Sequence, residues 1–210
     1  MLGLAQMYTN DCTLCDALAE NQKPTERKKF YNIALQENEK FAVFPCIGPL
    51  VLGHVMVISK KHSTSLASMG KPTVKEYDQF IMNIKKNHEL YGDDLLEAEH
   101  GSTAIDNAGS CVIHTHIHLI PKFGKFEKIF ESKLTPIMTT GKIEQLTNNR
   151  MPYIMIRGNS GKTRVFDATN IESQYIRRVL FEIEGREDWD WGAFPHKAII
   201  SETILYWQSH

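Results

Sequence analysis

Apolar and polar positions divide the first half of the chain into several strands. The apolar segments 31–36 and 41–44 flank a short polar stretch, a pattern that predicts a β-hairpin. In segment 54–58 four apolar residues follow His54, which is apolar enough to predict a central strand. Two more strands are expected over 93–99 and 110–120, on either side of a polar loop. The first half of the chain therefore predicts a sheet.

A single amphipathic helix is predicted between these strands. Thr73 and Glu76 have the spacing of a capping box, in which each side chain bonds a free backbone N–H of the first turn. Apolar residues then recur at helical spacing, so we expect a helix over 74–90 whose apolar face lies on the sheet. The residues of this face are Tyr77, Phe80, Ile81, Ile84 and His88.

The pattern changes from about residue 135. Segments 153–157 and 163–166 flank Gly158 and Gly161 and predict a second hairpin. A helix is expected after Ser173, and the aromatic tail should pack back on the body. We therefore expect two regions, with residues 1–134 forming the main domain and residues 135–210 forming a C-terminal α/β extension.

Composition and charge exclude several classes of function. The 210 residues include 24 basic and 25 acidic side chains, a net charge of −1, so no general field draws the chain to nucleic acid or to a membrane surface. The chain shows neither a transmembrane segment nor the pattern of a secretory signal. We therefore expect a cytoplasmic protein that binds neither a membrane nor extended nucleic acid.

Three histidines alternate along the strand expected over 110–120. His114, His116 and His118 are two residues apart, about 6.6 Å along a strand, and so share one face. A neutral imidazole can attack phosphorus and form a covalent intermediate, and a neighbouring ring can fix its tautomer. Histidines at this spacing can also chelate one metal ion. The spacing alone leaves both chemistries open.

Of the four cysteines, Cys12 and Cys15 form a Cys-x-x-Cys pair, a spacing typical of metal ligands or of a redox couple. Such a pair can be a redox couple, two buried thiols or half of a tetrahedral zinc site. Cys46 and Cys111 have no metal spacing, and we expect them to be small buried residues.

The segment 114–120, His-Thr-His-Ile-His-Leu-Ile, resembles the His-x-His-x-His signature of the histidine-triad superfamily. Segment 53–62, which begins Gly-His and ends Lys-Lys-His, is similar to the strand that precedes the signature in that family. The resemblance covers about residues 12–123. It implies an α+β fold, with an antiparallel sheet and flanking helices.

The resemblance also implies the roles of individual residues. His116 would be the nucleophile that becomes nucleotidylated, and His118 would hold its other ring nitrogen and support the charge that develops. His54, Ser110 and Cys111 would line the phosphate site.

In zinc-bearing members of the superfamily, an N-terminal cysteine pair joins two histidines around the metal. The resemblance therefore implies that Cys12, Cys15, His62 and His114 bind zinc. Four protein ligands leave no open position, so this zinc would be structural. It would also leave His116 free to react.

Three functions are compatible with the resemblance. The first is hydrolysis at the α-phosphate of a dinucleoside polyphosphate, a nucleoside phosphoramidate or a similar conjugate. The second is nucleotidyl transfer or phosphorolysis, with phosphate or a sugar phosphate as acceptor. The third is nucleotide binding with little turnover. His118, two residues after the nucleophile, favours hydrolysis, because uridylyltransferase relatives have glutamine there.

Three questions stay open from the sequence. No carboxylate lies near Cys46, where many relatives bind the ribose, so the nucleoside is not specified. The oligomeric state is also open, and a homodimer is one possibility. Gln174, Arg177 and Arg178 share a helix face and could bind phosphate, although a solvated face is the expected explanation.

Overall fold

The computed structural model describes residues 12–23, 29–102, 112–138, 142–148 and 151–210. Its helices are α1 (Thr13–Asn21), α2 (Lys71–Asn87), α3 (Ile129–Lys133), α4 (Tyr175–Ile183) and α5 (Lys197–Gln208). Its strands are β1 (Gln36–Glu37), β2 (Phe41–Pro45), β3 (Val55–Ser59), β4 (Leu95–Ser102), β5 (His116–Pro121), β6 (Pro136–Met138), β7 (Pro152–Arg157) and β8 (Thr163–Asp167). Short 3₁₀ helices are η3 (Ala67–Met69), η4 (Glu89–Tyr91), η5 (Gly124–Lys128) and η6 (Ile143–Asn148).

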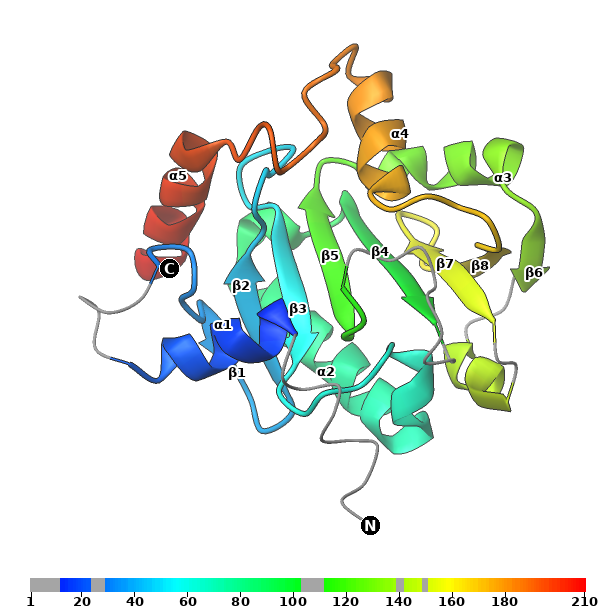
Figure 1. Ribbon diagram of the computed structural model, residues 1–210, viewed down its shortest axis with the longest axis horizontal. Helices are drawn as coiled ribbons and strands as arrows, with labels where there is room; N and C mark the ends of the chain where they lie inside the picture. The colour runs from blue at the N-terminus through cyan, green and yellow to red at the C-terminus, as the bar shows by residue number, and fades with distance from the viewer. Residues whose placement is uncertain (1–11, 24–28, 103–111, 139–141, 149–150) are drawn as a thin grey trace.

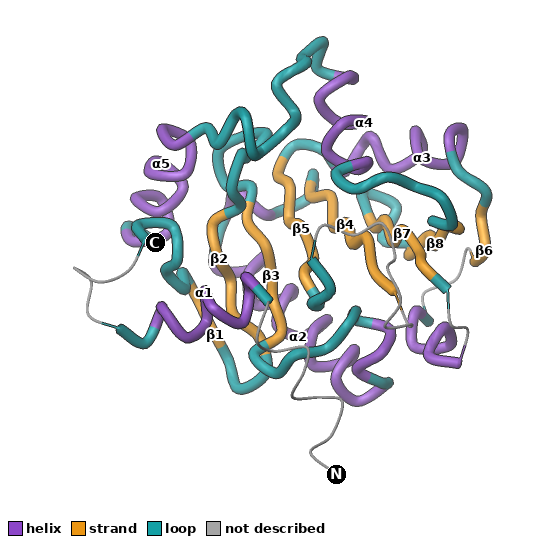
Figure 2. The backbone as a smooth tube through the Cα atoms, in the orientation of Figure 1, coloured by secondary structure: helices purple, strands orange, loops and turns teal. Residues whose placement is uncertain are grey.

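The strands form one antiparallel sheet in the order β1-β2-β3-β5-β4-β7-β8-β6 (Figures 1 and 2). Strands β2, β4 and β7 are largely buried on both faces, because helices cover both faces of the sheet. In β7, Tyr153 and Met155 join the core under α2, whereas Ile154 and Ile156 join the core under α4. This alternation follows from the two-residue period of a strand.

The two faces of the sheet are covered differently. Helix α2 packs along one face through Val74, Tyr77, Phe80, Ile81 and Ile84. On the other face, α1 packs against β2 and β3, and α3 and α4 pack against β4, β5 and β7. Figure 1 shows α1 in front of the first strands and α4 at one end of β5 and β4. Part of β5 on this second face lies between the two helices.

The C-terminal region continues the sheet directly from the first region. Strand β7 pairs with β4 from Glu97↔Arg157 to Ser102↔Pro152, so β4 is an interior strand. Arg157 also donates to Glu97, a buried carboxylate, at 3.3 Å. The predicted boundary after residue 134 falls between α3 and β6, and the regions on its two sides share one sheet and one core.

Most elements agree with the sequence patterns. The α+β fold with an antiparallel sheet is confirmed, as are the β7–β8 hairpin and helix α4. The aromatic tail packs back through Trp207, whose indole N–H donates to the Tyr91 hydroxyl at 2.8 Å. Trp191, in contrast, is partly exposed.

Two local predictions were wrong. Helix α2 begins at Lys71, and its N-cap is Gly70 with no side-chain cap. The Glu76 carboxylate binds Lys40 at 2.7 Å, so a long-range ion pair replaces the predicted capping box. The first hairpin is also shorter than expected, because only Gln36 and Glu37 of its first strand pair with β2.

Because the two regions share a core, we predict that Leu180→Ala destabilises the whole protein. Leu180 is 0% exposed on α4 and packs in the core that contains residues of β4, β5 and β7. Its truncation should lower the free energy of unfolding by about 2–5 kcal/mol. Leu205→Ala, at a leucine that is 64% exposed, is the matched control and should change it by less than about 0.5 kcal/mol. Urea unfolding should show one transition, and two separate transitions would contradict a shared core.

Candidate active site and metal centre

His116 and His118 lie on the sheet face between α1 and α4. In β5 they alternate with Ile117 and Leu119, which are buried in the core under α2. Pairing with β3 places Ile58 opposite His116 and Met56 opposite His118. The prediction that alternate residues share a face is confirmed for these two histidines. His114 precedes the strand and faces a different cluster.

The hydrogen bond of His116 sets which of its nitrogens can react. Its Nδ1 lies 2.7 Å from the carbonyl oxygen of His114. A carbonyl only accepts, so Nδ1 carries the proton, and the Nε2 of the neutral ring has a free lone pair. We expected His118 to hold this nitrogen, and that prediction was wrong. The backbone two residues earlier reaches Nδ1 instead, while the His116 and His118 ring centroids are 5.5 Å apart.

His118 is oriented by His54. The backbone N–H of Leu50 donates to His54 Nδ1 at 3.1 Å, so a neutral His54 is protonated on Nε2. That Nε2 lies 3.0 Å from His118 Nδ1 and donates to it. His118 Nδ1 is therefore an acceptor, and the neutral ring carries its own proton on Nε2. This chain of two bonds assigns both tautomers.

Burial keeps these rings neutral. It lowers the pKa of His54 well below the usual range of histidine, and the Arg177 charge lowers it further. Burial also lowers the pKa of His118 strongly, with smaller effects from His54, His116 and Arg177. For His116, burial lowers the pKa, and the bond to His114 acts in the opposite direction. At neutral pH the three rings are therefore uncharged.

Four side chains form a candidate metal centre beside this site. The ligand atoms of Cys12, Cys15, His62 and His114 all lie within 4.8 Å of one another. Cys12 Sγ is 3.3 Å from His114 Nδ1, and Cys15 Sγ is 3.4 Å from His62 Nδ1 and 3.5 Å from His114 Nδ1. His114 Nε2 lies 2.7 Å from the Ser59 carbonyl and donates to it. This bond leaves Nδ1 unprotonated and aimed at the cluster.

A second group, Cys46, His54 and His118, also has its ligand atoms within 4.8 Å. The two histidines already bond each other, and His54 Nδ1 accepts from the backbone. A guanidinium nitrogen of Arg177 lies 3.7 Å from Cys46 Sγ. Because the Arg177 cation is close and the bonded histidine nitrogens are already occupied, this group is better described as a hydrogen-bonded side of the pocket than as a metal site.

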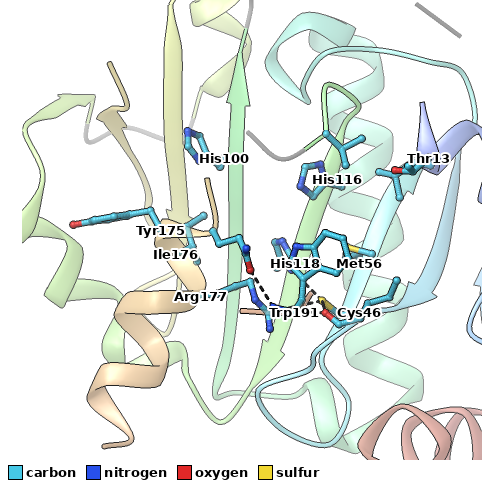
Figure 3. Close-up of a pocket in the computed structure, with 14 residues that line it drawn as sticks. Thr13, Cys46, Met56, His100, His116, His118, Tyr175, Ile176, Arg177 and Trp191 are labelled. Atoms are coloured by element: carbon cyan, nitrogen blue, oxygen red, sulfur yellow. Dashed lines mark hydrogen bonds between the residues drawn. The ribbon is translucent and has the colours of Figure 1, made fainter. Parts of the chain in front are cut away.

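The two triad histidines open into a pocket of about 140 Å³. Figure 3 shows His116 and His118 on one side and the start of α4 on the other. Most of the lining is apolar, and the extension contributes several residues. The lining residues are Thr13, Leu14, Cys46, Ile47, Met56, His100, Val112, His116, His118, Gln174, Tyr175, Ile176, Arg177 and Trp191.

The contribution of the extension corrects one prediction and confirms another. Arg177 is only 6% exposed and lines the pocket, so the expectation of a solvated face was wrong for this residue. It was right for the neighbouring Arg178, which is partly exposed and pairs with Glu172. In the sequence, the three-residue spacing from Gln174 to Arg177 was the feature that placed both residues on one helix face.

The remaining predicted site residues divide into two groups. His54 lies behind His118 and does not itself line the pocket. Ser110 and Cys111 lie outside the described residues. Cys46 is buried, as predicted, but its sulfur also faces the pocket.

Together, the fold and the site define a class of α+β proteins in which two pocket-facing histidines lie beside a Cys/His cluster. The family model for the HIT domain matches residues 27–125. An uncharacterized HIT-like protein from Borreliella burgdorferi is 31% identical over 118 residues, which cover 54% of this chain and 76% of that protein. A 16.1 kDa HIT-like protein from Mycoplasma pneumoniae is 24% identical, covering 59% of this chain and 79% of that protein. The chain belongs to the HIT family.

Two histidine triad proteins of known structure align with part of this chain. A zinc-bound histidine triad protein from Mycobacterium smegmatis is 24% identical with a TM-score of 0.40, covering 54% of this chain and 76% of that one. A hypothetical histidine triad nucleotide-binding protein from Sulfolobus tokodaii is 25% identical with a TM-score of 0.39, covering 53% and 69%. Each of these two matches therefore leaves nearly half of this chain without a counterpart.

Within the described part of the chain, no helix combines the length and apolar character needed to cross a bilayer.

Proposed function

We propose that this protein hydrolyses nucleotide conjugates at the α-phosphate through a covalent nucleotidyl intermediate on His116. The observation that carries the proposal is the 2.7 Å bond from His116 Nδ1 to the His114 carbonyl. It holds the ring by one nitrogen and leaves the Nε2 lone pair free in a residue that lines the pocket. Family membership supports a nucleotide as the bound molecule.

In the first step, His116 Nε2 attacks the α-phosphorus and forms a P–N bond. The bond from phosphorus to the leaving group breaks, and the leaving group keeps the electron pair and takes a proton from water. The ring then carries a positive charge, which the Nδ1–H bond to the His114 carbonyl stabilises. His118 Nε2–H donates to a phosphate oxygen and offsets the charge that develops there.

In the second step, water attacks the phosphorus and gives up a proton. The P–N bond breaks, its electron pair returns to Nε2, and the nucleoside monophosphate is released. His54 takes no part in bond making, and its role is to hold His118 in the tautomer that can donate. It is therefore a positioning residue.

We also propose that the Cys12, Cys15, His62 and His114 cluster binds structural zinc. Zinc bonds sulfur at about 2.3 Å and nitrogen at about 2.0 Å, which places tetrahedral ligand atoms about 3.5 Å apart. The sulfur–nitrogen distances of 3.3–3.5 Å fit this geometry. Burial and the neighbouring Cys12 raise the pKa of the Cys15 thiol to about 12, and a bound divalent cation would instead favour the thiolate. Four protein ligands leave the metal no position for substrate.

His116→Ala should abolish catalysis without unfolding the protein. The variant lacks the attacking nitrogen, so turnover should fall by at least about a thousandfold, and no covalent adduct should form. His118→Ala keeps the nucleophile and should still form the adduct, more slowly. Intact-protein mass spectrometry after brief exposure to a nucleotide conjugate, followed by peptide mapping, checks both. Near-parental turnover by His116→Ala, or an adduct elsewhere, would refute the mechanism. Repeating the assay with added phosphate separates hydrolysis from phosphorolysis.

Protein purified without chelators should contain one zinc ion per chain. Cys12→Ser removes a proposed ligand and should lower both the zinc content and the melting temperature, the latter by about 10 °C, because structural zinc contributes to folding. Cys46→Ser, at another buried cysteine outside the cluster, is the matched control and should keep its zinc. Elemental analysis makes the comparison, and zinc-free parent protein would remove the proposal.

A further inference from the structure

Helix α4 begins at the pocket with its first backbone donors uncapped. Gln174, the residue before the helix, has φ +62°, a left-handed conformation uncommon for residues other than glycine. No side chain caps the helix, and Gln174 and Tyr175 both line the pocket. The first N–H groups of a helix have no intrahelical partner and carry partial positive charge. The end of α4 that faces the histidines therefore favours an anion.

Arg177 adds a full positive charge at the same place. Its side chain reaches the carbonyl oxygen of Trp189 at 3.0 Å, the carbonyls of Ile47 and Gly48, and Cys46 Sγ at 3.7 Å. These acceptors are all neutral. Within the described ranges, Arg177 forms no ion pair with a carboxylate, although only 6% of it is exposed.

The carboxylate of Asp190 is near but engaged elsewhere. Its Oδ1 accepts from the Gln174 side-chain amide at 3.2 Å and from the Gly192 backbone at 2.9 Å. Gln174 in turn accepts from the Trp191 backbone N–H at 3.2 Å. These bonds fix the wall of the pocket. The bond from Gln174 is the largest cause of the lowered pKa of Asp190, the Arg177 charge makes only the smallest contribution to it, and the Arg177 and Asp190 side chains form no direct ion pair.

A structural role explains only part of this arrangement. Bonds to the carbonyls of Ile47 and Gly48 tie the β2–β3 loop to the extension. Neutral carbonyls do not neutralise a buried cation, however, and buried charges are normally paired. A guanidinium has five N–H donors, and the four bonds, one of them to a weak thiol acceptor, leave capacity for a ligand. Figure 3 shows Arg177 beyond His118, at the opposite end of the histidine pair from His116.

We propose that Arg177 and the N-terminus of α4 bind a second phosphate of the substrate, next to the one that His116 attacks. The C-terminal extension would thereby select nucleotide conjugates joined through a diphosphate or polyphosphate over conjugates that join one phosphate to a neutral group. This inference rests on the proposed function, since it assigns the substrate class of the same pocket. It also gives the extension a role in specificity.

The test compares two substrates with the same nucleoside, diadenosine tetraphosphate and an adenosine phosphoramidate of an uncharged amine. Arg177→Met should lower kcat/KM for the tetraphosphate about ten- to a hundredfold, because it removes charge-assisted hydrogen bonds. The phosphoramidate should change less than about threefold. Arg177→Lys keeps the charge and should fall between. Arg178→Met, at the neighbouring solvent-facing arginine, is the matched control and should leave both substrates within about twofold of the parent.

Equal losses on both substrates would mean that Arg177 only supports the fold, and would overturn the inference. Should Arg177→Met fail to fold, the parent enzyme and Arg177→Lys decide through inhibition. Inorganic pyrophosphate should compete with the phosphoramidate for the parent and more weakly for the variant. Absence of competition in the parent overturns the inference.

Failure of the proposed function would be seen separately, as no turnover and no adduct with either substrate. Calorimetry with inorganic pyrophosphate then tests the anion site alone. Binding to the parent that weakens at least about threefold in Arg177→Lys but not in Arg178→Met supports the site. No binding to the parent rejects it.

Discussion

The hydrogen bond from His116 to the carbonyl of His114 is the constraint on which the site depends. It decides which nitrogen of His116 carries the proton and therefore which one can attack. The carbonyl is itself held in place, because the His114 ring bonds Ser59 on one side and faces the Cys/His cluster on the other. Metal bound there would fix the backbone that orients the nucleophile. A structural metal would thus bear on the proposed chemistry without touching the substrate.

The pocket is a product of the whole sheet, since no one region contains it. Helix α1 closes one side, β5 supplies the histidines, and α4 closes the other side. The third wall depends on β7 extending the sheet from β4, which brings α4 over the same face. An HIT-family core has therefore been joined to an extension that adds a buried positive charge to its pocket.

Local patterns predict much of this fold, and long-range contacts explain the failures. Alternation and helical periodicity are local properties, so β3, β7, β8 and α4 follow from them. The resemblance to zinc-bearing histidine-triad proteins implies the four cluster residues, whose ligand atoms lie within 4.8 Å of one another. The start of α2 does not follow, because Glu76 pairs with Lys40, in the turn between β1 and β2. The partner of His118 is 64 residues away, and Arg177 bonds a loop 129 or more residues away. Such contacts depend on the topology of the sheet.

Nitrogen-15 NMR of the histidine rings at neutral pH tests which nitrogen of His116 is free to attack, since ring nitrogen shifts report which nitrogen is protonated. We expect a proton on Nδ1 and a bare Nε2 for His116, and the opposite tautomer for both His54 and His118. A proton on Nε2 of His116 in the ligand-free protein, with Nδ1 bare, would contradict the proposed role of His116, because the nitrogen facing the pocket would have no lone pair for phosphorus.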